Sequence, residues 1–168
     1  MCEVGPITRQ CGAATPGIAK LYLAEVGDIT NIGLPGPTDP WTIETPITLT
    51  AGKFWKDIPF VELEAGLVDE IADAVNGGFK KDIPFKLARY NAANNKWVND
   101  LIGARVIAII ADNNDQMIIV GSKKQPLRLE KAKGDTGQKP GDKNGWELNL
   151  TGNGDKPCFF YTGAVPLS

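Results

Sequence analysis

The chain has no histidine and only three cysteines, Cys2, Cys11 and Cys158. Without histidine it lacks the usual acid–base group of neutral pH and cannot form a Ser-His or Cys-His nucleophile pair. The cysteines form no CxxC motif, which removes most zinc sites. We therefore predict a protein that is not an enzyme, with no catalytic residue, no metal and no cofactor.

Other familiar signatures are also missing from the sequence. There is no GxGxxG or GxxxxGK[ST] loop for phosphate. No apolar run reaches the roughly 18 residues that a membrane helix needs, so we expect no membrane partner. The first residues carry no secretory signal, which predicts synthesis in a cytoplasm. Carboxylates cluster at 69–73 and 112–115, but nothing fixes a facing pair as a glycosidase needs, and we interpret them as surface. Residues 112–115 also lack the glycine and the distal glutamate of a calcium loop, which favours a turn.

Charge is unevenly distributed along the chain. Residues 1–78 carry 4 basic and 11 acidic side chains, whereas residues 79–168 carry 14 basic and 9 acidic ones. Such an imbalance predicts a molecule with two electrostatic faces. The alternative is that strands from both halves interleave in space, in which case the imbalance has no consequence for the surface.

Short β runs separated by turns dominate the pattern. The expected strands lie at residues 20–26, 41–44, 47–50, 54–64, 79–90, 105–111, 116–120, 127–129, 146–152 and 158–162. The segment 67–75 fits a helix by apolar spacing and a strand by position. The lysine-rich stretch 133–145 is predicted to be a loop.

One helix is expected between the strands at 79–90 and 105–111. Asn91 is a plausible N-cap, and Gly103 supplies the C-terminal stop. Its apolar stripe consists of Trp97, Val98, Leu101 and Ile102. Many short strands and one flanking helix predict a mainly β fold, a β-sandwich or open barrel, in a single domain at 19–168. Residues 1–18 are predicted to be an arm. We expect the arm and the Pro/Gly loop 33–40 to become ordered only in an assembly.

A seven-residue segment occurs twice. Residues 54–60 read FWKDIPF and residues 79–85 read FKKDIPF, a match at six of seven positions. Each copy alternates like a strand and contains a proline, Pro59 or Pro84, which predicts edge strands. We expect the copies to form a hairpin around Asn76-Gly77-Gly78 at a subunit interface. The predicted interface residues are Phe54, Trp55, Ile58, Phe60, Phe79, Ile83 and Phe85.

The order of several segments resembles tail-tube-like virion proteins of tailed phages, especially phages of Bacteroidales. The segments that carry this resemblance are 19–29 (AKLYLAEVGDI), 91–94 (NAAN), 103–113 (GARVIAIIADN) and 141–152 (GDKNGWELNLTG). The resemblance implies a β-sandwich-like barrel of the tail-tube type with one helix, and it makes residues 67–75 a strand. It also implies hexameric rings that stack into a channel for non-specific passage of genomic DNA.

The expected function is therefore that of a structural subunit of a phage tail or neck, placed in the virion and assembled in the host cytoplasm. Its partners would be copies of itself and neighbouring tail or neck proteins. The cysteine-containing arm and the lysine-rich stretch 123–143 depart from a plain tube protein, which leaves a neck or tail-end ring open. The charged contacts predicted between rings are Lys123, Lys124, Arg128, Lys131 and Lys133.

A second interpretation belongs to a different class of protein. The side chains of Trp41, Trp55, Trp146 and Tyr161 could form an aromatic platform for sugar stacking. In that case the chain would be a monomeric β-sandwich module that binds carbohydrate or another surface. A measurement of particle size separates the two interpretations, because only the first predicts rings or tubes.

Overall fold

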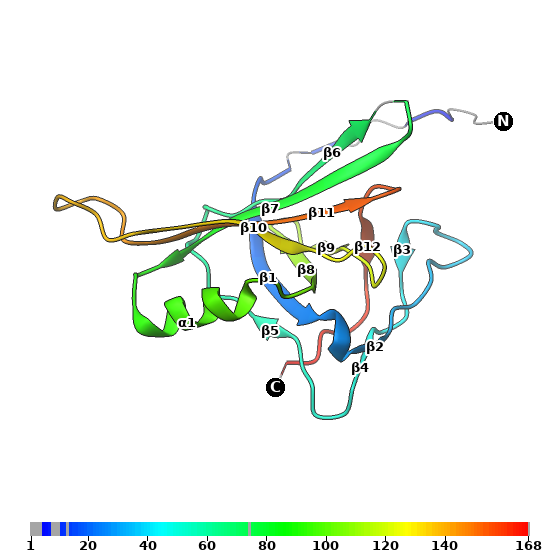
Figure 1. The fold of residues 1–168 in the computed structure, drawn as a ribbon. Helices are drawn as coiled ribbons and strands as arrows, with labels where there is room; N and C mark the ends of the chain where they lie inside the picture. Colours follow the sequence, from blue (N-terminus) through cyan, green and yellow to red (C-terminus); the bar gives the residue numbers. More distant parts are fainter. Residues whose placement is uncertain (1–4, 8–10, 13, 74, 168) are drawn as a thin grey trace.

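The computed structural model describes residues 5–7, 11–12, 14–73 and 75–167. Two β-sheets lie across one another, and a helix lies at one end (Figure 1). The mainly β class with one flanking helix is confirmed, and the described strands do not close into a barrel.

The larger sheet has six strands. In spatial order they are β3 (Thr42–Ile43), β12 (Phe159–Tyr161), β9 (Met117–Val120), β8 (Val106–Asp112), β1 (Ile18–Glu25) and β5 (Lys56–Asp57). β1 and β8 are its longest strands and pair antiparallel, with Leu23 opposite Ala108. The hairpin predicted from 105–120 is confirmed as β8 and β9.

The second sheet has four strands. In spatial order they are β10 (Arg128–Asp135), β11 (Gly145–Gly154), β7 (Gly78–Ala88) and β6 (Val68–Asp73). All pairs in this sheet are antiparallel, and β7 and β11 pair along ten residues of each strand. The hairpin of β6 and β7 projects beyond the body of the molecule on one side, and the turn after β10 projects on the other (Figure 1).

The remaining elements are short. A 3-10 turn, η1 (Val26–Asp28), follows β1, and β2 (Ile29–Asn31) pairs with β4 (Thr48–Leu49). The helix α1 (Ala92–Leu101) begins as predicted, because the Asn91 side chain accepts a hydrogen bond of 2.8 Å from the Asn94 N–H. Gly103 follows with φ of 77°, a conformation that glycine adopts without steric cost.

Two apolar clusters hold the layers together. The first lies between the two sheets and includes Leu21 and Leu23 of β1 together with Ile83 and Phe85 of β7. The second lies on the opposite face of the six-stranded sheet, where Ile107 and its neighbours pack under the segments 29–49. Because both faces of β1 and β8 are covered, these strands read as continuous apolar runs in the sequence.

The predicted hairpin of the repeated segments is wrong. The copies lie in different sheets, 54–60 around β5 and 79–85 inside β7, and the turn at 76–78 joins β7 to β6 instead. The prediction of edge strands holds for β5 but not for β7, which lies between β11 and β6.

Pro84 is tolerated inside β7 for a geometric reason. Its carbonyl accepts a bond of 3.1 Å from the Gly66 N–H, just before β6 begins. The nitrogen and the carbonyl of one strand residue face the same side of the strand. The Pro84 nitrogen, which has no hydrogen to donate, therefore faces residue 66 and not β11. The ladder with β11, where Pro84 stands opposite Asn149, therefore loses no hydrogen bond.

Several segment predictions are also settled. Residues 68–73 form a strand, as the resemblance implied. β10 extends from Arg128 to Asp135, so the loop predicted at 133–145 is wrong at its start and begins only after the strand ends. Pairing with β11 continues past the short apolar pattern of β10, which is why the pattern underestimated its length.

Candidate functional site

The predicted interface residues fall into two groups. Four of them, Trp55, Ile58, Ile83 and Phe85, are buried inside the subunit with at most 5% exposure. A side chain that is already covered by its own chain cannot bury itself against a neighbour. The exposed or half-buried members are Phe54, Phe60 and Phe79.

The aromatic side chains proposed for sugar stacking do not lie on one surface. Trp55 and Tyr161 are buried in the second apolar cluster. Trp146 stacks on Tyr90 with ring centroids 5.4 Å apart, whereas Trp41 stacks on Phe159 at 5.5 Å. Trp146 lines one pocket, whereas Trp41 and Phe159 line another, so the four rings form no shared platform.

The edges of the six-stranded sheet are covered by the chain itself. At β3, the Gly36 N–H donates to the Thr42 carbonyl (3.1 Å), so the Pro/Gly loop 33–40 lies along this edge. At β5, the Trp55 N–H donates to the Pro166 carbonyl (3.1 Å). Both edges are therefore blocked to further pairing by segments that contain proline, which offers few donors of its own.

The edges of the four-stranded sheet are open within the described residues. β6 pairs only with β7, and β10 pairs only with β11. All six residues of β6 are exposed, which is unusual for a strand that contains Val68 and Ile71. An exposed strand edge of this kind is a template for pairing with another chain.

The two open edges differ in charge. β6 carries Asp69, Glu70 and Asp73 and no basic residue. β10 carries three basic side chains, Arg128, Lys131 and Lys133, against two acidic ones. These three were predicted contacts, and the structure places them together on one edge.

The other two predicted basic contacts lie elsewhere. Lys123 and Lys124 follow β9, and the Lys123 Nζ donates to the Thr30 carbonyl at 3.0 Å. They stand at the rim of a groove of about 840 Å³ between the loop 33–40 and strands β9 and β12. Leu34, Trp41 and Phe159 line its apolar part, and Lys156 completes the rim. We call this feature the lysine-rimmed groove.

β6 is anchored by a group of residues that the sequence analysis missed. The Lys81 Nζ lies 3.3 Å from Asp69 Oδ1 and donates to the Lys156 carbonyl at 2.6 Å. Asp69 Oδ2 accepts from the Cys158 N–H at 2.9 Å. Lys81 shares the inward, period-2 face of β7 with Ile83 and Phe85, and this position was the available signal that its charge needs a buried partner.

Cys158 belongs to the same anchor, and its thiol is expected to be unreactive. Burial is the main cause that raises the pKa of its thiol to about 12, and the nearby Lys81 charge opposes this only in part. At neutral pH the thiol therefore keeps its proton and is a weak nucleophile. Cys11 is exposed, and Cys2 lies outside the described residues.

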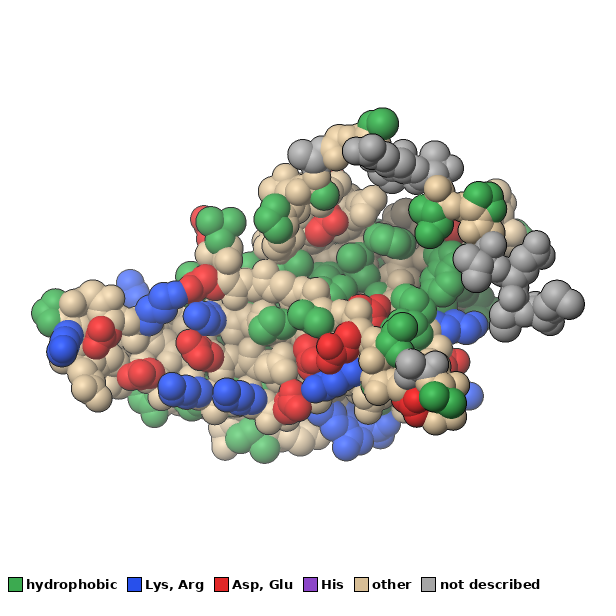
Figure 2. All heavy atoms as spheres, turned by 90° about the horizontal axis from the view of Figure 1, so that it is seen from above, with side chains coloured by type: hydrophobic (Ala, Val, Ile, Leu, Met, Phe, Trp, Pro, Cys, Tyr) green, Lys and Arg blue, Asp and Glu red, His purple; other side chains and the backbone are tan. Residues whose placement is uncertain are grey.

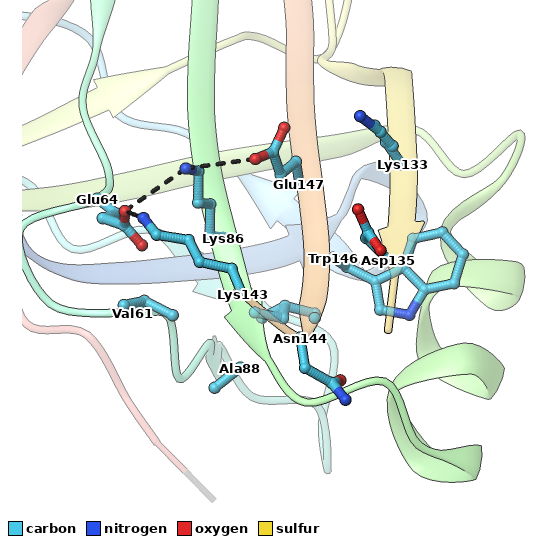
Figure 3. Close-up of a pocket in the computed structure, with 12 residues that line it drawn as sticks. Val61, Glu64, Lys86, Ala88, Lys133, Asp135, Lys143, Asn144, Trp146 and Glu147 are labelled. Atoms are coloured by element: carbon cyan, nitrogen blue, oxygen red, sulfur yellow. Dashed lines mark hydrogen bonds and ion pairs between the residues drawn. The ribbon is translucent and has the colours of Figure 1, made fainter. Parts of the chain in front are cut away.

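A pocket of about 290 Å³ lies beside β7 and β11 (Figure 3). Its charged side chains largely neutralise one another: Lys86 lies 3.5 Å from Glu64 and 3.4 Å from Glu147, and Lys143 also pairs with Glu64. The Lys86 ammonium lies between the carboxylates of Glu64 and Glu147 and pairs with both (Figure 3). The arrangement fastens the segment 61–66 to the sheet.

The charge imbalance between the halves of the sequence is partly cancelled by folding. Glu64 and Asp69 from the acidic half pair with Lys86, Lys143 and Lys81 from the basic half. Acidic and basic side chains are accordingly interspersed on the face in Figure 2. The imbalance survives locally, at the open edges and at the groove.

Among the described residues, no helix is long and apolar enough to cross a membrane. The same part of the chain contains no cluster of three or more potential metal ligands. Comparisons of the sequence and structure with protein-family models, with curated proteins and with solved structures find no match.

Proposed function

We propose that the protein is a structural subunit of a phage tail or neck that assembles into rings around a channel for DNA. The observation that carries this proposal is the pair of open, oppositely charged edges of the four-stranded sheet. Pairing β6 of one copy with β10 of the next removes both edges and continues the sheet from subunit to subunit. Such a contact joins unlike surfaces and closes into a ring when the rotation permits.

The charges favour this pairing over like-with-like contacts. Two β6 strands would oppose acidic residues, and two β10 strands would oppose basic ones, and like charges directly opposite destabilise a sheet. The pairing of β6 with β10 brings Glu70 and its neighbours toward Lys131 and Lys133. Charge thus specifies which edges meet more than how tightly they hold.

The outer face of the four-stranded sheet suits passage of DNA without strong attachment. Lys80 pairs with Asp82 (3.6 Å) and Glu130 (3.9 Å), and Lys86 pairs with Glu147. Lysines that are neutralised within the subunit provide few free charges for phosphates. We therefore expect no tight or sequence-specific binding of duplex DNA.

The first test is the size of purified wild-type protein by light scattering, with negative-stain imaging of its particles. Rings or tubes are expected. A stable monomer at high concentration would contradict the proposal and favour a monomeric binding module.

The second test blocks one edge without disturbing the subunit. Because Gly66 donates to Pro84, the alternation of an antiparallel pair turns the N–H of Ile71 toward the open edge of β6. Ile71→Pro should then leave pairing with β7 intact but abolish ring formation, since proline removes the outward donor. Ile71→Thr keeps the donor and is the matched control. Rings of normal stability from the proline variant would show that β6 is not the contact.

A further inference from the structure

An unusual turn lies between β5 and β6. Leu63 has φ of 63°, a strained conformation for a side chain other than glycine, and it is 87% exposed. The turn is held rigidly, because the Val61 N–H donates to the Lys86 carbonyl (2.8 Å) and the Glu64 N–H donates to the Val61 carbonyl (3.2 Å). The fold thus presents a fixed apolar knob beside the exposed carboxylate of Glu62, whereas Glu64 is paired with Lys86 and Lys143. We call it the 61–64 turn.

The lysine-rimmed groove has the complementary properties. Its apolar part includes Leu34, which is 83% exposed, and the half-exposed ring of Trp41. Its rim carries three exposed lysines, Lys123, Lys124 and Lys156. None of the three forms an ion pair among the described residues, and Lys123 donates to the Thr30 carbonyl. An acidic apolar knob therefore matches this groove in both polarity and charge.

The turn and the groove lie at opposite ends of the subunit. The 61–64 turn is bonded to β7 at Lys86, on the side of α1. The groove includes Lys156, whose carbonyl is bonded to Lys81 near the other end of β7. The loop between β2 and β3, which forms one wall, projects on the side away from α1 (Figure 1). A contact between turn and groove therefore joins copies along the strand direction of the four-stranded sheet.

We propose that the 61–64 turn of one copy docks into the lysine-rimmed groove of a second copy and thereby stacks rings on one another. This inference rests on the proposed function, in which pairing of β6 with β10 runs across the strands. Docking along the strands is a separate direction of growth. It assigns Lys124 and Lys156 to contacts between rings, and Lys131 and Lys133 to contacts within a ring.

The principal test is Leu63→Gly. Glycine adopts a positive φ without strain, so the subunit should be at least as stable to heat as the wild type. Removing the leucine side chain that docking would bury should raise the concentration at which rings stack by about 10- to 100-fold. Ile102→Ser, which changes another exposed apolar residue outside both surfaces, is the control and should stack normally. Ring diameter and stack length are read from negative-stain images.

A charge exchange tests the partner surface. Glu62→Lys and Lys124→Glu should each weaken stacking by about 2- to 5-fold, and the double variant should recover it. Single rings without stacks from Leu63→Gly would support the docking, whereas wild-type stacking by that variant, or loss of its rings, would overturn it. If the wild type forms no rings but associates through Leu63, the ring proposal fails and the docking stands. If copies do not associate at all, both fail.

Discussion

Replacement of Lys81 should show how much the anchor of β6 contributes to stability. The side chain of Lys81 is 7% exposed and contacts both Asp69 and the Lys156 carbonyl. Lys81→Met keeps most of the buried stem but leaves the Asp69 carboxylate with the Cys158 N–H as its remaining partner. Breaking a fully buried pair costs about 3–5 kcal/mol, and the 20% exposure of Asp69 reduces our expectation to about 2–3 kcal/mol.

The adjacent residue provides a matched control. Lys80 lies on the outer face of the same strand, is 38% exposed and forms only surface pairs. Lys80→Met should therefore cost about 0–1 kcal/mol. Urea unfolding at pH 7 measures both changes, and for a chain of this size each kcal/mol lowers Tm by roughly 2–4 °C.

A double variant separates the charge from the packing. Adding Asp69→Asn to Lys81→Met removes the stranded carboxylate and should recover part of the lost stability. If Lys81→Met costs no more than Lys80→Met, the buried anchor does not stabilise β6 as we reason. The fraying of β6 can be followed by hydrogen exchange, because this strand is held to the body partly through Asp69.

Three further outcomes are expected. Asn91→Ala should lower the free energy of unfolding by about 1 kcal/mol in urea, since it removes the hydrogen bond that caps α1; an unchanged midpoint would mean that the cap is dispensable. At pH 8 the thiolate fraction of Cys158 should be about 1000-fold lower than that of a thiol with a pKa near 9. Alkylation followed by mass spectrometry should therefore modify the exposed Cys11 first, and equal rates would contradict the raised pKa of Cys158. Assembly should slow as salt approaches roughly 1 M, and Lys123→Glu/Lys124→Glu should reduce both the rate and its salt dependence; a rate indifferent to salt and to this charge reversal would rule out electrostatic steering.

Local patterns in the sequence were sufficient for many elements of the fold. The apolar runs at 105–111 and 116–120, separated by a polar turn, form β8 and β9 as expected. The Asn91 cap and the Gly103 stop enclose α1 because both signals act through hydrogen bonds and backbone angles within one turn of the helix. Such signals are local, and the residues that carry them are neighbours in the chain.

The fate of the repeated segment was decided by tertiary structure. Two nearly identical sequences became a two-residue edge strand in one sheet and part of an eleven-residue inner strand in the other. Their isoleucines, Ile58 and Ile83, nevertheless enter the same apolar cluster. Period-2 alternation tells which side chains point inward, but it does not say which distant strand will pair with each edge.

The candidate contact surfaces likewise depended on the fold. Composition alone showed an excess of acid in the first half and of base in the second, and folding cancelled part of it through pairs such as Glu64 with Lys86. The open edges at β6 and β10, and the groove at the end opposite the 61–64 turn, exist only once the strand order is established. The sequence by itself determined the hairpin of β8 and β9 and the limits of α1, because these follow from short-range geometry. Tertiary structure alone decided which polar groups and strand edges were left for a neighbour, because that depends on every pairing made elsewhere in the chain.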